Sequence, residues 1–362
     1  MPKPELACLV INARSCHRRT NNSWILSRIL RDFDVWRHPD CDRVEAQKLK
    51  ELQAKEDALA KEQKRAPRTK RIALRVTVWD CKATSGRGAG DMAYWAGLFV
   101  SVVQLVIATI PWAMWDEPFT FWVTAIGTVL AYASGALPQW VEEKSGVRKT
   151  SLNNPAKDRK AVFLTEGNGS HEALLILSHH GSLDLEALAG PQRSLQNPGA
   201  TRVYSTLLAI LWLALLISVA GWDQHTWFLL GVGLLGLVHN AAVCAFRRRP
   251  PAFGLELEYQ QTIAEGTVME VLYAVETRFP QAGAALLDEF FSGDLRPREE
   301  LIWRYARQRY EAWYRDGCLM RSDGAPNARD MPSLHRTVGT LDDSDILGLQ
   351  DSTVGAVGQQ SA

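Results

Sequence analysis

Two pairs of long apolar runs interrupt an otherwise charged sequence. The first pair spans residues 92–112 and 118–138 and is joined by a short acidic link, and the second pair spans residues 202–221 and 226–246. Each run has about the 20 residues that a helix needs to cross a hydrocarbon core of roughly 30 Å. The pattern therefore predicts an α-helical polytopic membrane protein with four transmembrane helices arranged as two hairpins.

The charges that flank these runs predict how the hairpins are oriented. The two short links, residues 113–117 and 222–225, contain no Lys or Arg. In contrast, Lys82 and Arg87 precede the first hairpin, and three arginines at residues 247–249 follow the second. Lys and Arg near the ends of transmembrane helices are retained on the cytosolic side. Both termini and the segment between the hairpins are therefore predicted to be cytosolic.

Shorter patterns outside the apolar runs predict a small α+β cytosolic domain. Alternation over residues 71–79 predicts a half-buried strand, and residues 161–165 and 172–177 predict two more strands. Residues 166–170, EGNGS, have the composition of the turn between the last two. Residues 183–188 predict the start of a helix or the end of a strand. We expect the three strands to form one small sheet beneath the membrane.

Helical periodicity predicts further elements. Apolar residues between Trp24 and Trp36 recur at helical spacing with arginines among them. This pattern favours an amphipathic helix packed on the cytosolic domain, with a helix lying on the membrane surface as the alternative. The charged residues 41–65 are typical of a solvated helix. Residues 268–275 and 282–291 predict two helices, one on each side of Pro280.

The end of the chain is less regular. Residues 298–315 mix aromatic and basic side chains and predict a helix, either at the membrane interface or packed on the sheet. From Gly317 onward the polar composition predicts disorder. The predicted organisation is a cytosolic N-terminal region (1–90), a transmembrane hairpin (91–138), a cytosolic insert (139–201), a second transmembrane hairpin (202–246), a cytosolic helical region (247–316) and a disordered tail (317–362).

Composition narrows the classes of function. The 362 residues carry a formal net charge of +1, which gives no global attraction to nucleic acid. Six cysteines lie far apart without a CxxC pair, so we expect reduced thiols rather than a zinc or disulfide framework. No secretory signal opens the chain, and Asp32 and Asp34 end an N-terminal stretch that otherwise resembles a mitochondrial presequence. Neither pattern assigns an organelle.

The best candidate for chemistry lies in the insert. His171, His179 and His180, with Asp184 and Glu186, are residue types that bind metal ions, although their spacing fits no ligand signature. Neighbouring residues of a strand point to opposite sides, so the last two histidines rarely reach one metal. Surface or capping histidines are favoured. GxSxG, phosphate-loop and dinucleotide motifs are absent from the sequence, so no catalytic residue or cofactor is predicted.

Three strongly polar residues lie in the interior of the apolar runs, at Gln104, His239 and Asn240. Polar groups within a bilayer are candidates for a transport pathway. A single interhelical hydrogen bond is the favoured role for Gln104. His239 and Asn240 lie near the cytosolic boundary, where we expect hydrogen bonds to Gln104 or to backbone carbonyls.

A row of small residues follows one side of the second apolar run. Gly127, Ala131 and Gly135 recur at every fourth position. Small residues at this spacing let another helix approach closely. The row predicts packing within the bundle, with homo-oligomerisation as the alternative.

Five segments carry a resemblance: residues 91–98 (DMAYWAGL), 133–140 (ASGALPQW), 164–170 (LTEGNGS), 183–189 (LDLEALA) and 268–291. They resemble a family of uncharacterised fungal polytopic integral membrane proteins that has no assigned activity. The resemblance covers about residues 85–300 and implies membrane location and the same layout, but no site.

The working hypothesis is a non-enzymatic membrane protein that anchors a cytosolic interaction domain. Its expected partners are the lipid bilayer and a protein, and not nucleic acid. A small transporter or channel subunit, resting on the intramembrane polar residues, is the first alternative. A membrane enzyme with a cytosolic site near residues 171–186 is the second.

Overall fold

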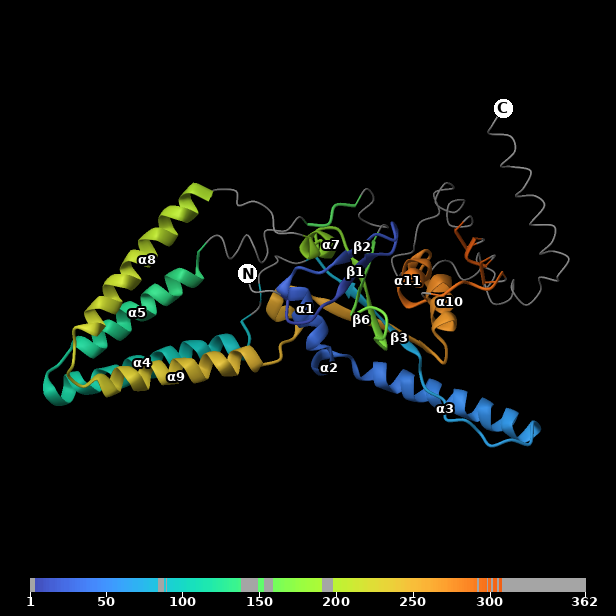
Figure 1. Cartoon of the computed structure of the whole chain (residues 1–362), viewed down its shortest axis with the longest axis horizontal. Coiled ribbons are helices and arrows are strands. Elements are labelled where there is room, and N and C mark those ends of the chain that lie inside the picture. Colours follow the sequence, from blue (N-terminus) through green and yellow to red (C-terminus); the bar gives the residue numbers. More distant parts are fainter. Residues whose placement is uncertain are drawn as a thin grey trace, which may run out of the picture.

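A sheet with helices on both faces forms one part of the molecule, and long helices project from one side of it (Figure 1). The computed structural model describes residues 4–83, 88, 90–137, 149–152, 159–190, 198–291, 293–297, 299–300, 302–304 and 306–307. Its elements in chain order are β1 (Leu9–Asn12), β2 (Arg18–Thr20), α1 (Trp24–Arg31), α2 (Phe33–Trp36), α3 (Pro39–Glu62), β3 (Leu74–Cys81), α4 (Met92–Trp115), α5 (Phe119–Gly135), β4 (Lys160–Thr165), β5 (Glu172–Ser178), α7 (Leu185–Ala189), α8 (Pro198–Ala220), α9 (Thr226–Ala245), the 3-10 helix η1 (Pro250–Phe253), β6 (Leu257–Glu265), α10 (Val268–Arg278) and α11 (Ala282–Phe290).

The described strands form one six-stranded sheet in the order β2-β1-β4-β5-β3-β6. β3 and β5 are parallel neighbours, and the other neighbouring pairs are antiparallel. The three strands predicted from the sequence are present, in the centre of this larger sheet. Strands β1, β2 and β6 were not predicted, so strands from the N-terminal region, the insert and the segment after the second hairpin all contribute to one domain.

Both apolar hairpins are inserted into the sheet rather than placed before or after it. α4 and α5 lie between β3 and β4 in the sequence, and α8 and α9 lie between β5 and β6. Cys81, which ends β3, is opposite Ser178 at the end of β5 and Leu257 at the start of β6. Ser178 is also opposite Lys160, which starts β4. These four strand ends therefore lie together; we call this the helix-side end of the sheet, and the opposite end the distal end.

Each face of the sheet is covered by its own hydrophobic core. One core packs α10, α11 and Trp303 on the sheet, and the other packs α1, α2 and α7 on the opposite face. Val76 and Val78 of β3 belong to the first core and Trp79 to the second. The prediction that this strand is half-buried is therefore wrong: seven of its eight residues are buried. Arg75 and Thr77, which alternate with the valines, suggested that one face of the strand is exposed. Helices of the N-terminal region cover that face.

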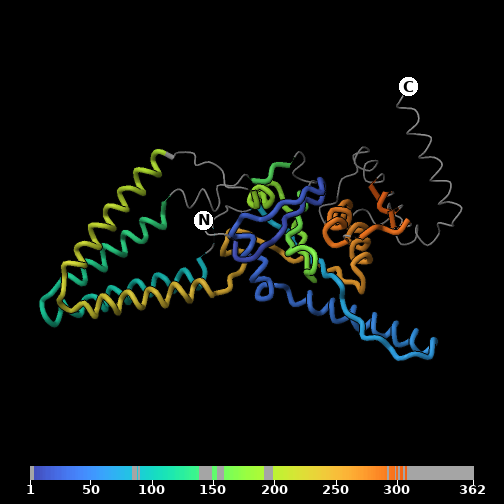
Figure 2. The backbone as a smooth tube through the Cα atoms, in the orientation of Figure 1, coloured from blue at the N-terminus to red at the C-terminus, as the bar shows by residue number. Residues whose placement is uncertain are grey.

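The long apolar helices pack as two adjacent pairs, α4 with α9 and α5 with α8 (Figure 2). Three of the described helices, over residues 92–115, 199–220 and 226–245, are long and apolar enough to cross a membrane, and α5 is shorter at 17 residues. Most of their large apolar side chains are exposed, which is the surface expected of helices in lipid rather than in water. The molecule therefore combines candidate membrane-spanning helices with a mixed α/β part.

The predicted helix over residues 24–36 is present as two helices, α1 and α2, separated at Asp32. Its apolar residues Ile25, Leu26 and Ile29 are buried in the core of the sheet, so the packed interpretation is confirmed. The solvated helix corresponds to α3. The described residues between 297 and 307 are helical. The rest of the helix predicted to reach residue 315, and the tail from residue 317, lie outside the described residues.

Candidate functional site

Polar side chains gather at both ends of the parallel pair β3 and β5, and a third group lies where α1 meets α4 and α9. The distal group surrounds Arg75, the helix-side group surrounds Asp80 and His179, and the junction group surrounds Asp32. Ligands of open α/β sheets bind beside the ends of neighbouring strands, most often the carboxyl ends. The two ends of this strand pair are therefore the first places to examine.

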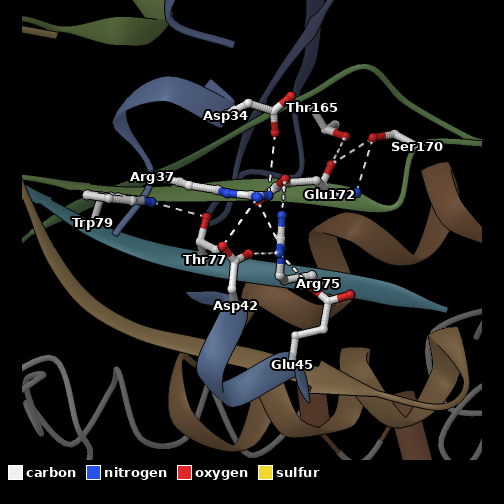
Figure 3. Close-up of polar contacts among 10 residues, drawn as sticks. All are labelled: Asp34, Arg37, Asp42, Glu45, Arg75, Thr77, Trp79, Thr165, Ser170 and Glu172. Carbon is white, nitrogen blue, oxygen red and sulfur yellow. Dashed lines mark hydrogen bonds and ion pairs between the residues drawn. The ribbon is translucent and has the colours of Figure 1, made fainter. Parts of the chain in front are cut away.

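Arg75 is buried in the middle of the distal group (Figure 3). Its Nε and Nη2 atoms donate to the two carboxylate oxygens of Glu172, at 3.2 and 2.7 Å, and its Nη1 atom donates to Glu45 at 2.5 Å. Asp42 lies 3.4 Å from Nη1 and also pairs with Arg37 at 3.2 Å. A guanidinium that meets a carboxylate through two parallel bonds is fixed in direction. The group therefore ties α3 to both parallel strands.

Burial and ion pairing oppose each other in this group. Burial raises the pKa of the Glu172 carboxyl above its ordinary value, although the hydrogen bond from Arg75 lowers it. Burial disfavours the charge on Arg75 as well, but the hydrogen bond and the charge of Glu172 raise the pKa of the guanidinium. Since a buried carboxylate that loses its cation is strongly unfavourable, Glu172 depends on Arg75.

A groove of about 1010 Å³ opens beside this group at the distal end of the sheet. Leu49 of α3 and Ile72, which precedes β3, give it apolar walls, and His171 and Gly266 also line it. Arg71 contributes an exposed cation to the lining. The groove therefore combines apolar contact surface with an exposed positive charge, beside an ion-pair group that holds its walls in place.

The helix-side group is compact. His179 Nε2 lies 2.7 Å from Asp80 Oδ1. Arg159 donates to both oxygens of Asp80, at 2.8 and 3.0 Å, and also contacts His179. The hydroxyl of Ser182 donates to the backbone oxygen of His179, at 2.7 Å, and not to the ring. The arrangement orients an imidazole, but the described contacts direct no hydroxyl or thiol toward it.

The structure does not bring the three candidate histidines together. His171 precedes β5 and the other two follow it, and a seven-residue strand is about 23 Å long. His180 accepts a hydrogen bond from a backbone N–H at 3.2 Å. Asp184 and Glu186 pair with Lys160 at 2.7 and 2.9 Å. Within the described ranges, no group of three or more His, Cys, Asp or Glu side chains is arranged to hold a metal ion.

The strongly polar residues of the apolar runs lie on two facing helices, α4 and α9. Gln104 Nε2 of α4 donates to the backbone oxygen of Val232 of α9 at 2.9 Å, which is an interhelical hydrogen bond. His239 faces α4 as well, because a Cβ added at Gly97 would lie 3.3 Å from its Nε2 atom. Asn240 is exposed. The amide of Gln104 is therefore bonded to a carbonyl rather than to either of the other two side chains.

The row of small residues on α5 meets one neighbour. A Cβ added at Gly127 would lie 3.5 Å from Leu215 of α8, so the two helices approach closely there. Ala131 is exposed, and no atom lies within 4 Å of a Cβ added at Gly135. The contact within the bundle thus involves one end of the row.

The junction group joins the sheet domain to the apolar helices. Arg28 of α1 donates to the backbone oxygen of Cys244 in the last turn of α9, at 3.0 Å. Asp32, which is fully buried, accepts a hydrogen bond from the backbone N–H of Arg248 at 2.9 Å. The Arg248 side chain in turn pairs at 3.0 Å with Asp91, the residue that caps α4. The feet of α4 and α9 are therefore bound to α1.

Sequence reasoning did not find Arg75, Asp80 or Arg159. Arg75 and Glu172 are 97 residues apart, and Asp80 and Arg159 are 79 residues apart. No local pattern pairs such residues, and only the adjacency of β3, β5 and β4 places them in contact. No family model matches the chain, and neither a curated protein nor a solved structure matches it.

Proposed function

We propose that the protein is a multi-pass membrane protein that holds a cytosolic interaction domain against one face of the membrane. In this proposal α4, α5, α8 and α9 each cross the bilayer, and both termini lie on the same side as the sheet. The observation that carries it is the position of four strand ends. The ends that lead to or from the apolar helices all lie at the helix-side end of the sheet. Both hairpins must therefore return to the side from which they left.

α5 is the shortest of the four proposed crossings. Its 17 residues extend about 26 Å, slightly less than a hydrocarbon core of roughly 30 Å. A short span is accommodated by local thinning of the bilayer or by flanking residues. Contacts between the two hairpin tips support the proposal that both hairpins reach the same depth in the bilayer. His225 lies 2.6 Å from Glu117, and Trp222 stacks on Phe119 with ring centroids 4.3 Å apart.

The distal groove is the surface that we assign to a protein partner. It lies at the end of the sheet away from the membrane, so a soluble protein reaches it without meeting lipid. Its apolar walls, at Leu49 and Ile72, suit apolar side chains of a peptide, and the exposed Arg71 suits an acidic residue beside them. The Arg75 group keeps the walls fixed, and a preformed surface loses less entropy on binding.

Site-specific photocrosslinking in cells tests this assignment. A photoreactive amino acid at Leu49, in the groove, is expected to capture a partner, whereas one at Lys55, an exposed position of α3 outside the groove, is not. The captured protein, once purified, is expected to bind the wild-type chain and not the Leu49→Asp variant. Leu49 is already 37% exposed, so this substitution is expected to leave the fold intact. Equal capture at both positions, or equal binding of the variant, would remove the groove from the proposal.

The two alternatives have less support. A transporter or channel subunit needs polar groups that are available to a substrate, and the amide of Gln104 is bonded to a backbone oxygen of α9. An enzyme with a site near residues 171–186 needs His171 and His179 together, and β5 lies between them. Kinship with the fungal polytopic family stays a proposal that rests on the five similar segments.

A further inference from the structure

The three arginines of the junction group, Arg28 and Arg31 of α1 and Arg248 after α9, each have an acid partner. Arg28 pairs with Glu5 at 2.7 Å, and Arg31 pairs with Glu5 at 2.6 Å and with Asp32 at 2.7 Å. Arg248 pairs with Asp91. Three acids therefore neutralise three arginines, and the group has no net charge of its own.

Arg247 and Arg249 remain outside this balance. Both side chains are exposed, and within the part of the chain that the structure describes neither has an acid at ion-pair distance. They follow α9, which ends at Ala245, by two and four residues. Two uncompensated cations thus lie where an apolar helix ends, at the level of lipid headgroups if α9 crosses the membrane.

The two exposed side chains lie on one short segment, on either side of Arg248 in the sequence. Residues 246 and 249 have extended φ and ψ angles, and no helix is present between α9 and η1. Arg248, which lies between them in the sequence, is directed toward Asp91, and residues 247 and 249 are at most about 7 Å apart along the chain. The hydrogen bond from the Arg248 backbone to the buried Asp32 ties this segment to α1.

We propose that Arg247 and Arg249 bind the phosphate and carboxylate groups of an acidic phospholipid headgroup, such as that of phosphatidylserine, at the cytosolic membrane surface. A guanidinium matches the oxygens of either group with two parallel hydrogen bonds, and two guanidiniums on one short segment meet the two acidic groups of one headgroup. The contact would add a specific lipid to the junction that binds α1 to α4 and α9. The inference rests on the proposed function, because it takes α9 to end at the cytosolic surface.

Native mass spectrometry of the full chain, titrated with phosphatidylserine or phosphatidylcholine, tests the proposal. An arginine near an anionic membrane surface changes affinity about fivefold, so Arg247→Gln/Arg249→Gln is expected to weaken phosphatidylserine binding about 25-fold. Each single variant is expected to weaken it about fivefold. Lys55→Gln/Lys61→Gln removes the same charge from exposed positions of α3 and is expected to change nothing. Phosphatidylcholine binding is expected to be equal in all variants.

Two results would overturn the proposal. One is equal phosphatidylserine binding by the wild-type chain and the double variant. The other is binding of soluble glycerophosphoserine as tight as that of the lipid, because the site would then take a free anion rather than a membrane component. Insertion of the chain into phosphatidylcholine nanodiscs is measured in parallel. Failure to insert contradicts the proposed membrane function, whereas insertion without a preference for the anionic lipid contradicts only the site.

Discussion

Replacing Arg75 by Met gives a direct test of how the distal group holds the sheet domain together. The substitution keeps most of the apolar side chain and removes the guanidinium. Glu172 then loses both of its bonds to the guanidinium while its side chain is only 19% exposed. Glu45 and Asp42 are 38% and 52% exposed, so water replaces most of what they lose.

The expected loss follows from this difference in exposure. Removing one partner of a buried ion pair costs about 3–5 kcal/mol. Because Glu172 retains some contact with solvent, we expect the lower end, about 3 kcal/mol, or about a 150-fold increase in the unfolding constant. Changing Glu172 to Gln as well removes the uncompensated charge, so the double variant is expected to recover to within about 1 kcal/mol of wild type. Arg43→Met removes an exposed pair with Asp40 and is expected to cost less than about 1 kcal/mol.

Buried thiols report the unfolding of this domain in the full chain. Cys41 and Cys81 are fully buried, and they become reactive to maleimide only when the domain opens. The assay follows their labelling against urea in nanodiscs, with the exposed Cys16 and Cys244, and also Cys318, replaced by Ser. A single variant as stable as wild type would contradict the assigned role of Arg75. A double variant no better than the single one would show that lost packing, rather than lost charge, causes the effect.

Three further outcomes follow from other contacts. Gly283→Ala is expected to destabilise the domain by at least about 2 kcal/mol in the same labelling assay, because the new Cβ would lie 2.3 Å from a backbone oxygen of α10, whereas Gly293→Ala, with no atom within 4 Å, is expected to be neutral. The pKa of Glu56 is lowered from 4.5 to about 2 by hydrogen bonds from Arg65 and Lys70, which follow α3, so its stabilising contacts are complete above pH 4.5 and are lost as the pH falls toward 2. Amide protection after α3, measured relative to the intrinsic exchange rate at each pH, is expected to fall over that window in wild type and to stay constant in Glu56→Gln. Gln104→Leu, which removes the bond to Val232, is expected to lower the free energy of unfolding of the membrane helices by about 1 kcal/mol, measured by thermal unfolding, and to leave proton leak in vesicles unchanged.

The elements that could be predicted from the sequence are those whose signal is local. The apolar helices follow from length and hydropathy alone, and α4 differs from its predicted range mainly by continuing to Trp115. β4 and β5 were predicted because β-branched and apolar residues flank a glycine-containing turn. β1 has only four residues and β2 only three, and neither carries an alternating pattern long enough to recognise.

Features that depend on topology could not be predicted. β3 reads as half-buried because Arg75 and Thr77 alternate with valines, and the sequence does not show that α3 and Glu172 supply partners for the arginine. The insert histidines are close in sequence but lie at opposite ends of β5, whereas Asp80, far away in sequence, meets His179. Adjacency of strands, rather than spacing along the chain, determines which side chains share a site.

Asp32 shows the same limit at the junction. In the sequence it is only an acidic residue among the arginines of the amphipathic pattern over residues 24–36. In the structure it ends α1, lies fully buried and accepts a hydrogen bond from Arg248, 216 residues later. A charged residue with that burial signals a tertiary partner, but the partner is found only when the foot of α9 is placed beside α1.

Membrane topology is the central claim, and thiol labelling in sealed vesicles with the cytosolic face outward tests it most directly. Single cysteines are compared in a background without other exposed thiols: native Cys16 in the sheet domain, and Asp116→Cys and Asp223→Cys at the two hairpin tips. An impermeant maleimide is expected to label Cys16 in intact vesicles and the two tip positions only after permeabilisation. Labelling of either tip together with Cys16 in intact vesicles would contradict the account, because that hairpin would not cross the membrane.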